Sequence, residues 1–198
     1  MHMGKVISGF TMSLDGFIAG PNDDIRRLFT WYYSGDTPFP VPGTDMVFQI
    51  SRASADYIGE LWGSIGAMVT GRRDFDVSGA WGGRPPYGWP AYIVTHTPPQ
   101  EWLREGSPFT FVTDGVASAI EQAKRAAGEK HVVVGGTTIV QQCIEAGLLD
   151  EIHIDLASML LGDGISLFGQ LGIEPVDLER TAVIEGTGVT HLRFRIVK

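Results

Sequence analysis

Two glycines followed by two threonines form the most chemically suggestive stretch of the chain. Gly135-Gly136-Thr137-Thr138 comes directly after the β-branched run Val132–Val134, which is typical of a buried strand. Apolar residues at helical spacing follow, so either Thr137 or Thr138 is predicted to cap a helix that stops at Gly147. Glycines let a ligand approach the backbone, and a helix N-terminus offers N–H groups and partial positive charge to a phosphate. An ordinary tight turn fits the same residues, so a phosphate site needs support from elsewhere in the chain.

Three further predicted strand ends carry residues that suit a phosphate-containing cofactor. They are Thr70-Gly71-Arg72-Arg73, Val94-Thr95-His96 and Ser13-Leu14-Asp15-Gly16. Ligands of mainly parallel sheets bind at the carboxyl ends of the strands, where these residues would gather. Guanidinium forks and hydroxyls are what a pyrophosphate and a ribose 2′-phosphate require. An arginine pair is also a common solvated surface feature, and Asp15 also suits a turn in which its carboxylate accepts local N–H groups.

The standard motifs of several other site classes are absent from the sequence. No Gly-x-Gly-x-x-Gly and no Walker-type Gly-Lys-Ser/Thr loop occurs, and Ser64 misses the nucleophile-elbow pattern by one position. The five histidines show no metal-ligand spacing, and His153 with Asp155 on one strand face gives too few ligands. We therefore predict no metal site.

Composition indicates a globular chain with a substantial core. The 198 residues are 43% hydrophobic and 19% charged, and residues 4–198 are expected to form a single domain after a cloning remnant at 1–3. The net charge of −8 argues against nucleic acid or an anionic membrane as the partner. No apolar run approaches the roughly 18 residues that span a bilayer. One cysteine, Cys143, suits a reducing compartment, so we expect a cytoplasmic protein.

Strands and helices are predicted to alternate along the chain. A helix is expected to start at Thr44-Asp45 and run to about residue 63, and Asp114 is expected to cap another that ends at Gly128. The last two strands read as an antiparallel hairpin. The predicted fold is an α/β protein with a mixed, mainly parallel sheet, helices on both faces and this C-terminal hairpin. The expected strands cover 5–12, 67–70, 91–95, 109–113, 132–134, 151–156, 179–184 and 190–197.

A long aromatic segment separates the first predicted strand from the first long helix. Residues 22–43 contain Trp31, three prolines and further aromatic residues. A connection of this length in a compact domain is usually a functional loop, so we expect a substrate lid there.

Four motifs occur in the order expected for one known family. They are Ser-Leu-Asp-Gly-Phe-Ile-Ala-Gly at 13–20, Thr-Gly-Arg-Arg-Asp-Phe at 70–75, Val-Gly-Gly-Thr-Thr at 134–138 and Leu-Leu-Asp-Glu-Ile-His-Ile at 148–154. In this combination the chain resembles the reductase domain of bacterial riboflavin biosynthesis, the RibD C-terminal family, which has the dihydrofolate reductase fold. The resemblance spans roughly residues 4–197. The zinc-ligand motifs of the deaminase domain that often precedes this module do not occur in the sequence, so a stand-alone reductase is expected.

This resemblance implies an NADPH-binding fold. Gly71, Arg72 and Arg73 would hold the cofactor phosphates, with Thr95 and His96 near the adenosine phosphate. A second group at the Gly-Gly turn would cradle the pyrophosphate: Gly135, Gly136, Thr137 and Thr138. A third group would lie against the nicotinamide: Ile18, Ala19 and Gly20.

The substrate half carries no motif that can be transferred. Asp45, in the first turn of the predicted first helix, stands roughly where dihydrofolate reductases place a pterin-anchoring carboxylate, although an acid at a helix start is also ordinary. We take Asp45 and Asp15 as the catalytic candidates. The main hypothesis is hydride transfer from NADPH to a small planar heterocycle of the pyrimidinone or pterin type. The alternatives are a true dihydrofolate reductase and a non-catalytic NADP(H)-binding protein.

The resemblance also favours a homodimer, because relatives of the riboflavin reductase type are commonly dimeric. The final strand alternates apolar Leu192 and Phe194 with cationic His191 and Arg193, so a sheet or hairpin surface is the expected contact. In a monomer the apolar face would pack inward and the cationic face would be solvated.

Overall fold

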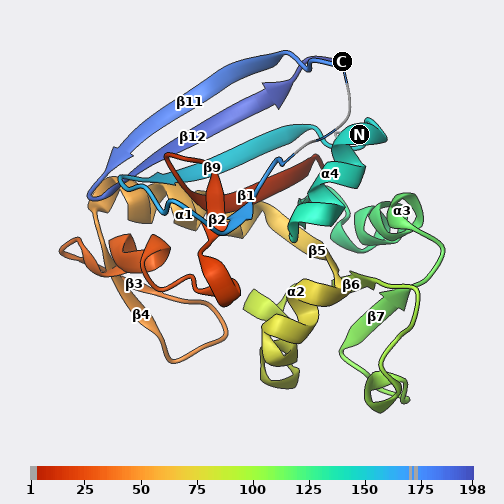
Figure 1. Ribbon diagram of the computed structural model, residues 1–198. Coiled ribbons are helices and arrows are strands. Elements are labelled where there is room, and N and C mark those ends of the chain that lie inside the picture. Colours follow the sequence, from red (N-terminus) through yellow and green to blue (C-terminus); the bar gives the residue numbers. More distant parts are fainter. Residues whose placement is uncertain (1–3, 170, 172–173) are drawn as a thin grey trace. The chain divides into compact units, whose positions relative to one another are not determined.

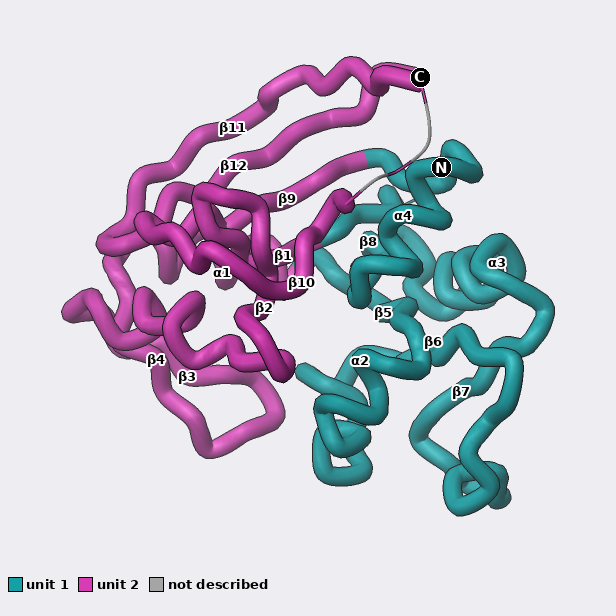
Figure 2. Tube along the Cα trace, viewed as in Figure 1, with its two compact units in different colours: residues 1–8, 64–150 teal, residues 9–63, 151–198 magenta. Residues whose placement is uncertain are grey.

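The chain divides into two compact units. The computed structural model describes residues 4–169, 171 and 174–198, and the expected cloning remnant at 1–3 lies outside them. Unit 1 holds the described residues up to Ser8 together with Ser64–Asp150, and unit 2 holds Gly9–Gly63 and Glu151–Lys198 (Figure 2). The division into units does not test whether residues 4–198 form a single domain, so that expectation stays a prediction.

Unit 1 is built on parallel strands that carry helices. Its hydrogen-bonded order is β1, β8, β5, β6, β7, and each neighbouring pair is parallel (Figure 1). Valines at 132 and 134 and Val69 are fully buried, as expected for strands inside a sheet. The strands are β1 (Val6–Ser13), β5 (Ile65–Gly71), β6 (Ala91–Val94), β7 (Phe109–Val112) and β8 (His131–Val134).

The helices of unit 1 follow its strands in the chain. In α3 (Val116–Ala127), Ala119, Ile120 and Ala123 form a buried stripe at helical spacing, and the helix contacts β5, β6, β7 and β8. A second core surrounds Phe75 of α2, with Ile93 and Phe109. The remaining helices are α2 (Arg72–Val77) and α4 (Thr137–Glu145), and 3-10 turns span Gly79–Gly83, Pro86–Gly88 and Gln100–Trp102.

Unit 2 contains the antiparallel strands. β11 pairs with β12 and β12 with β9, in the order that continues through β1, so that the sheet has eight strands, β11-β12-β9-β1-β8-β5-β6-β7. The predicted mainly parallel sheet and C-terminal antiparallel hairpin are therefore confirmed. The long strands of unit 2 are β9 (Glu151–Ala157), β11 (Leu178–Gly186) and β12 (Val189–Ile196). Two separate two-stranded sheets are also antiparallel. One pairs β2 (Phe17–Ala19) and β10 (Ile165–Ser166), and the other pairs β3 (Thr37–Pro40) and β4 (Val47–Ile50).

The prediction of a helix from Thr44 is wrong. Residues 47–50 form β4, in which Phe48 and Ile50 are buried and their neighbours exposed, the alternation of a half-buried strand. Helix α1 (Arg52–Ser64) begins later, after Ser51, whose Oγ accepts the Ser54 N–H at 3.2 Å as an N-cap does. The predicted helix started eight positions too early, because the helical pattern included apolar residues of β4, which directly precedes α1.

Two predicted helix caps are also wrong. Gly115 and Gly136 occupy the N-cap positions of α3 and α4, with φ values of 101° and 77°. Glycine takes these positive φ angles without the strain that Asp114 or Thr137 would suffer there. The predicted stop at Gly147 is confirmed, because that residue follows α4 with φ 64°.

The expected lid segment is more ordered than its composition indicated. A 3-10 turn spans Leu28–Tyr33, and Leu28 and Trp31 within it are almost fully buried. Tyr32 stacks on Phe48 of β4 with ring centroids 4.0 Å apart. Packing of its aromatic side chains therefore anchors this part of the segment within unit 2.

Candidate cofactor site

The Gly-Gly turn leads directly into α4. β8 ends at Val134, the Gly135 N–H donates to the Val69 carbonyl at 2.8 Å, and α4 begins at Thr137 after Gly136. Gly136, the N-cap residue of α4, has no side chain that could cap the first turn. The N–H groups of that turn, which no helical carbonyl can bind, are consequently available to an anion, and the helix dipole favours negative charge there.

The adjacent strand ends in a similar way. β5 is the parallel neighbour of β8, and Gly71 at its end is the N-cap of α2, which begins with Arg72. A Cβ atom at position 136 would lie 3.6 Å from the Gly71 nitrogen, so the two strand-to-helix turns pack against each other. The structure thus brings Gly71, Gly135 and Gly136 together, as the sequence predicted for the carboxyl ends of neighbouring strands.

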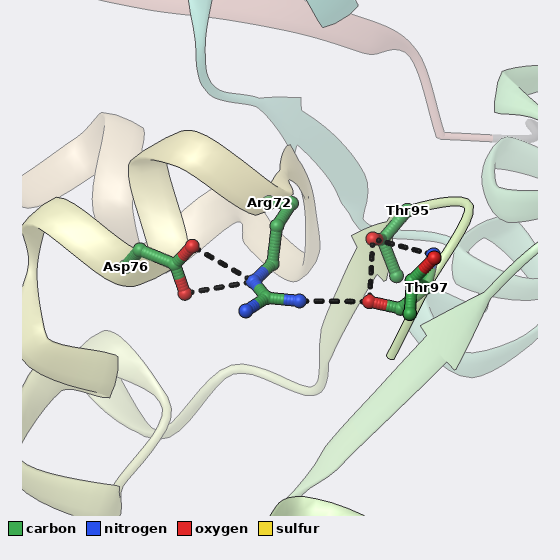
Figure 3. Close-up of polar contacts among 4 residues, drawn as sticks. All are labelled: Arg72, Asp76, Thr95 and Thr97. Carbon is green, nitrogen blue, oxygen red and sulfur yellow. Dashed lines mark hydrogen bonds and ion pairs between the residues drawn. The ribbon is translucent and has the colours of Figure 1, made fainter. Parts of the chain in front are cut away.

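Arg72 connects α2 to the turn after β6. Its Nε lies 2.7 and 2.8 Å from the two carboxylate oxygens of Asp76, and its Nη1 donates to the Thr97 carbonyl at 2.7 Å (Figure 3). Thr95 Oγ1 accepts the Thr97 N–H at 3.2 Å, which closes that turn. The guanidinium therefore holds the Thr95 turn in place, and Asp76 offsets part of its charge.

The other residues predicted for this part of the site differ in exposure. Arg73 and His96 are exposed, and Thr95 is buried at the end of β6. Thr138 lies exposed in the first turn of α4. All of them belong to unit 1.

Sequence reasoning missed one acidic residue in this region, Asp74. Thr70, fully buried at the end of β5, donates its hydroxyl to Asp74 Oδ2 at 2.7 Å. Burial raises the pKa of the Asp74 carboxyl above its usual value, and the Thr70 hydrogen bond opposes that shift. An acid in the first turn of α2, three residues after Gly71, has an ordinary explanation in the helix dipole, which is why the pattern did not single it out.

The residues predicted to lie against the nicotinamide belong to unit 2. Ile18 and Ala19 are in β2, paired with β10, and Gly20 follows. Ala19 and Gly20 are buried, and a side chain at Gly164 would overlap the Ala19 carbonyl oxygen. Close packing with residues 164–166 therefore fixes the backbone of this segment.

Asp15 has a positioning role in unit 2. Its carboxylate accepts the Ser13 hydroxyl and the N–H groups of Leu161 and Gly162, the last at 2.7 Å. These hydrogen bonds, that of Ser13 above all, lower the pKa of Asp15 to about 2. Asp15 is therefore ionised at neutral pH and holds the 161–162 loop, so it is poorly suited to donate a proton.

The helical placement of Asp45 is wrong. The residue lies exposed in the turn between β3 and β4, seven positions before α1 begins. A carboxylate that anchors a pterin must be buried against the ring, because only there does its charge-assisted hydrogen bond exclude water. The sequence argument for this role therefore no longer holds.

Three further properties of the described residues bear on function. No three His, Cys, Asp or Glu side chains gather there in a way that could hold a metal ion. None of the helices formed by those residues is both long and apolar enough to span a bilayer. Cys143 is buried in α4, and burial raises its thiol pKa to about 12, so it is a packing residue.

The fold has clear relatives among solved structures. A dihydrofolate reductase from Enterococcus faecalis, complexed with NADP(H), is 15% identical, with a TM-score of 0.56 over 99% of this chain and 98% of its own. A protein named for riboflavin biosynthesis from Shewanella sp. PV-4 is 20% identical, with a TM-score of 0.73 over 98% and 99%. The fold is therefore that of the dihydrofolate reductases, as predicted.

The sequence then gives the family. The RibD C-terminal domain matches residues 4–192, so the chain belongs to the RibD C-terminal domain family. A Thermotoga maritima diaminohydroxyphosphoribosylaminopyrimidine deaminase/5-amino-6-(5-phosphoribosylamino)uracil reductase is 11% identical, with a TM-score of 0.65. It aligns with 98% of this chain, which spans 57% of that protein's length.

Proposed function

We propose that the protein is a reductase that transfers a hydride from NADPH to a small planar heterocycle of the pyrimidinone or pterin type. Its place in the RibD C-terminal domain family supports an oxidoreductase of riboflavin biosynthesis. The observation that carries the proposal is the junction of two glycine turns in unit 1, at Gly71 and Gly135–Gly136, beside Arg72. We also propose that the protein acts in the cytoplasm.

The residues of unit 1 fit the phosphates of a dinucleotide. The first turn of α4 would donate N–H groups to the pyrophosphate, with Gly135 and Gly136 allowing close approach. Arg72 and Arg73 would add positive charge, and Thr95 with His96 would lie near the adenosine phosphate. When bound, NADPH supplies the hydride, so the chain's own residues bind, orient and exclude water.

Cofactor preference and reduction test this proposal. Isothermal titration calorimetry should show that NADPH binds roughly ten- to a hundredfold more tightly than NADH, the value of one charge-assisted contact. Loss of absorbance at 340 nm should then reveal turnover with a pyrimidinone or pterin, screened beside a quinone. Equal affinity for the two nucleotides would contradict the cofactor assignment, and binding without turnover of any heterocycle would favour a non-catalytic NADP(H)-binding protein.

The dihydrofolate reductase alternative makes a different prediction. It requires a carboxylate that anchors the pterin, and Asp45, its candidate, is exposed. Reduction of dihydrofolate that falls strongly in Asp45→Asn would restore that alternative. We expect instead that this variant reduces every accepted substrate as the parent does.

A further inference from the structure

Asp74 lies against the turn that the proposed function assigns to the cofactor pyrophosphate. A Cβ atom built on Gly135 would be 3.5 Å from Asp74 Oδ2 and 3.2 Å from Thr70 Oγ1. A Cβ atom on Gly136 would be 3.7 Å from Asp74 Cβ and 3.4 Å from Thr70 Oγ1. The absence of side chains at both glycines therefore lets the Thr70–Asp74 pair lie directly against the turn.

An ionised carboxyl at this position works against an anionic ligand. Two negative charges separated by about 5 Å repel by roughly 1 kcal/mol even at the dielectric constant of water, and by more where water is excluded. A protonated carboxyl carries no such penalty and can donate a hydrogen bond to a phosphate oxygen. The geometry thus couples the charge of one side chain to the affinity of the site.

We propose that Asp74 sets the affinity of the Gly135–Gly136 turn for the pyrophosphate of a nicotinamide dinucleotide, admitting it when protonated and disfavouring it when ionised. This inference rests on the proposed function, because it assumes that a dinucleotide binds there. It makes Asp74 an affinity-determining residue that acts on the phosphates, whichever heterocycle is reduced.

The surroundings leave few other groups that could produce the same effect. Arg72, Arg73 and Asp76 share α2 with Asp74. The segments packed against α2 include β5, β6, β7, Gly79–Gly83 and, through the ring contact of Phe75 with Trp102, the turn Gln100–Trp102. Their titratable side chains in the described structure are Tyr92 of β6 and Glu101 of that turn, and Glu101 is exposed. Residues 135–138 have none. His96 follows β6 and, as a histidine, can change charge near neutral pH.

The direction of the pH effect follows from proton linkage. A bound pyrophosphate favours the protonated carboxyl, so it raises the pKa of Asp74, and binding takes up protons at pH values between the pKa of the free protein and that of the complex. Affinity is then full below the pKa of Asp74 in the free protein and falls as pH rises through it. Because burial raises that pKa, the fall begins above the usual carboxyl range.

The test measures the dissociation constants of NADPH and NADH by calorimetry from pH 4 to pH 8.5. Asp74→Asn, which preserves shape, should bind both nucleotides at least about threefold more tightly at high pH and should lose most of the pH dependence. Thr70→Val removes the hydroxyl that stabilises the ionised carboxyl, so the fall in affinity should move to higher pH. Asp114→Asn removes the same charge from an exposed site between β7 and α3 and should behave as the parent does.

The outcomes separate this inference from the proposed function. If the parent binds neither nucleotide, both fail. If the parent binds NADPH and Asp74→Asn leaves affinity and pH profile unchanged, only the role of Asp74 is overturned, as it is when His96→Gln abolishes the pH dependence instead. Tighter NADPH binding with weaker NADH binding in Asp74→Asn would also overturn it, since Asp74 would then contact the ribose 2′-hydroxyl. Thermal unfolding confirms that each variant is folded, and Thr70→Val carries the test if Asp74→Asn is not.

Discussion

His191 Nδ1 lies 2.6 Å from Asp155 Oδ1, across the antiparallel pair of β12 and β9. Nε2 of the same ring is 2.8 Å from the Ser54 hydroxyl of α1, so the imidazole bridges a helix and two strands of unit 2. The ring is completely buried, stacked on Tyr57 with centroids 4.5 Å apart. This Ser–His–Asp arrangement is closed to substrate and serves as an internal crosslink, whereas the monomer alternative considered from the sequence places His191 on a solvated face.

Removal of the Asp155 carboxylate should destabilise the protein. In Asp155→Ala the buried imidazole loses a hydrogen-bond partner, which costs about 1–3 kcal/mol in the free energy of unfolding. Urea denaturation measures this loss. Glu185→Ala, an exposed acid on β11, is the matched control and should change stability by less than about 0.5 kcal/mol. Equal effects of the two substitutions would show that the crosslink contributes nothing.

The sequence predicted the parallel part of the fold better than the candidate site. Strands such as Val132–Val134 are short, β-branched and end at glycines, so their local signal agrees with their tertiary role. The predicted start of α1 was wrong because only one residue, Ser51, separates β4 from the helix. The roles of Asp74 and Asp15 could not be predicted from the sequence, because they depend on contacts that form only when turns and loops have folded. These contacts are the Thr70–Asp74 hydrogen bond and the hydrogen bonds that Asp15 accepts from the 161–162 loop.

The contribution of Arg72 to nucleotide binding can be isolated with a matched pair. Arg72→Gln removes a charge and the hydrogen bond that holds the Thr97 carbonyl, so NADPH affinity should fall roughly ten- to a hundredfold. Arg125 of α3 forms an equivalent ion pair with Glu121, four residues earlier, and Arg125→Gln should leave the affinity unchanged. If both variants bind as the parent does, Arg72 is only a brace between α2 and the 95–97 turn.

We expect NADPH binding to require a glycine at position 136, and not only the positive φ angle that glycine allows. Gly136→Ala places a Cβ 3.4 Å from Thr70 Oγ1 and strains a backbone with φ 77° and ψ 129°, at roughly 1–3 kcal/mol of stability. Gly128→Ala, at φ 62° with open space around it, pays the same kind of strain away from the turn. We expect both variants to melt at a lower temperature and only Gly136→Ala to lose NADPH affinity. Equal affinity in both would make the Gly-Gly turn purely structural.

Asp15 should stabilise the folded protein in a pH-dependent way. Its pKa of about 2 in the folded protein lies below the ordinary 3.8, so its contribution is complete above about pH 4 and is lost as pH falls towards 2. Asp15→Asn should therefore melt below the parent at pH 7, and the difference should shrink on acidification. Asp45→Asn, at the exposed β3–β4 turn, should match the parent at pH 7. A difference between Asp15→Asn and the parent that stays constant down to pH 2 would contradict this assignment.

The outer face of the β11–β12 hairpin should form a homodimer contact. Val183 pairs with Leu192 and Leu178 with Ile196, so these four side chains share one face of the sheet. Val183 is 49% and Leu178 45% exposed, so they form an apolar surface that a second copy of the chain would cover.

Light scattering at micromolar concentration should give a mass about twice the 21.5 kDa of the chain. Val183→Glu should lower it to that of the monomer, because a buried unpaired charge opposes association. Leu103→Glu, equally exposed in unit 1, should remain a dimer. A parent that scatters as a monomer with and without NADPH would exclude this assembly.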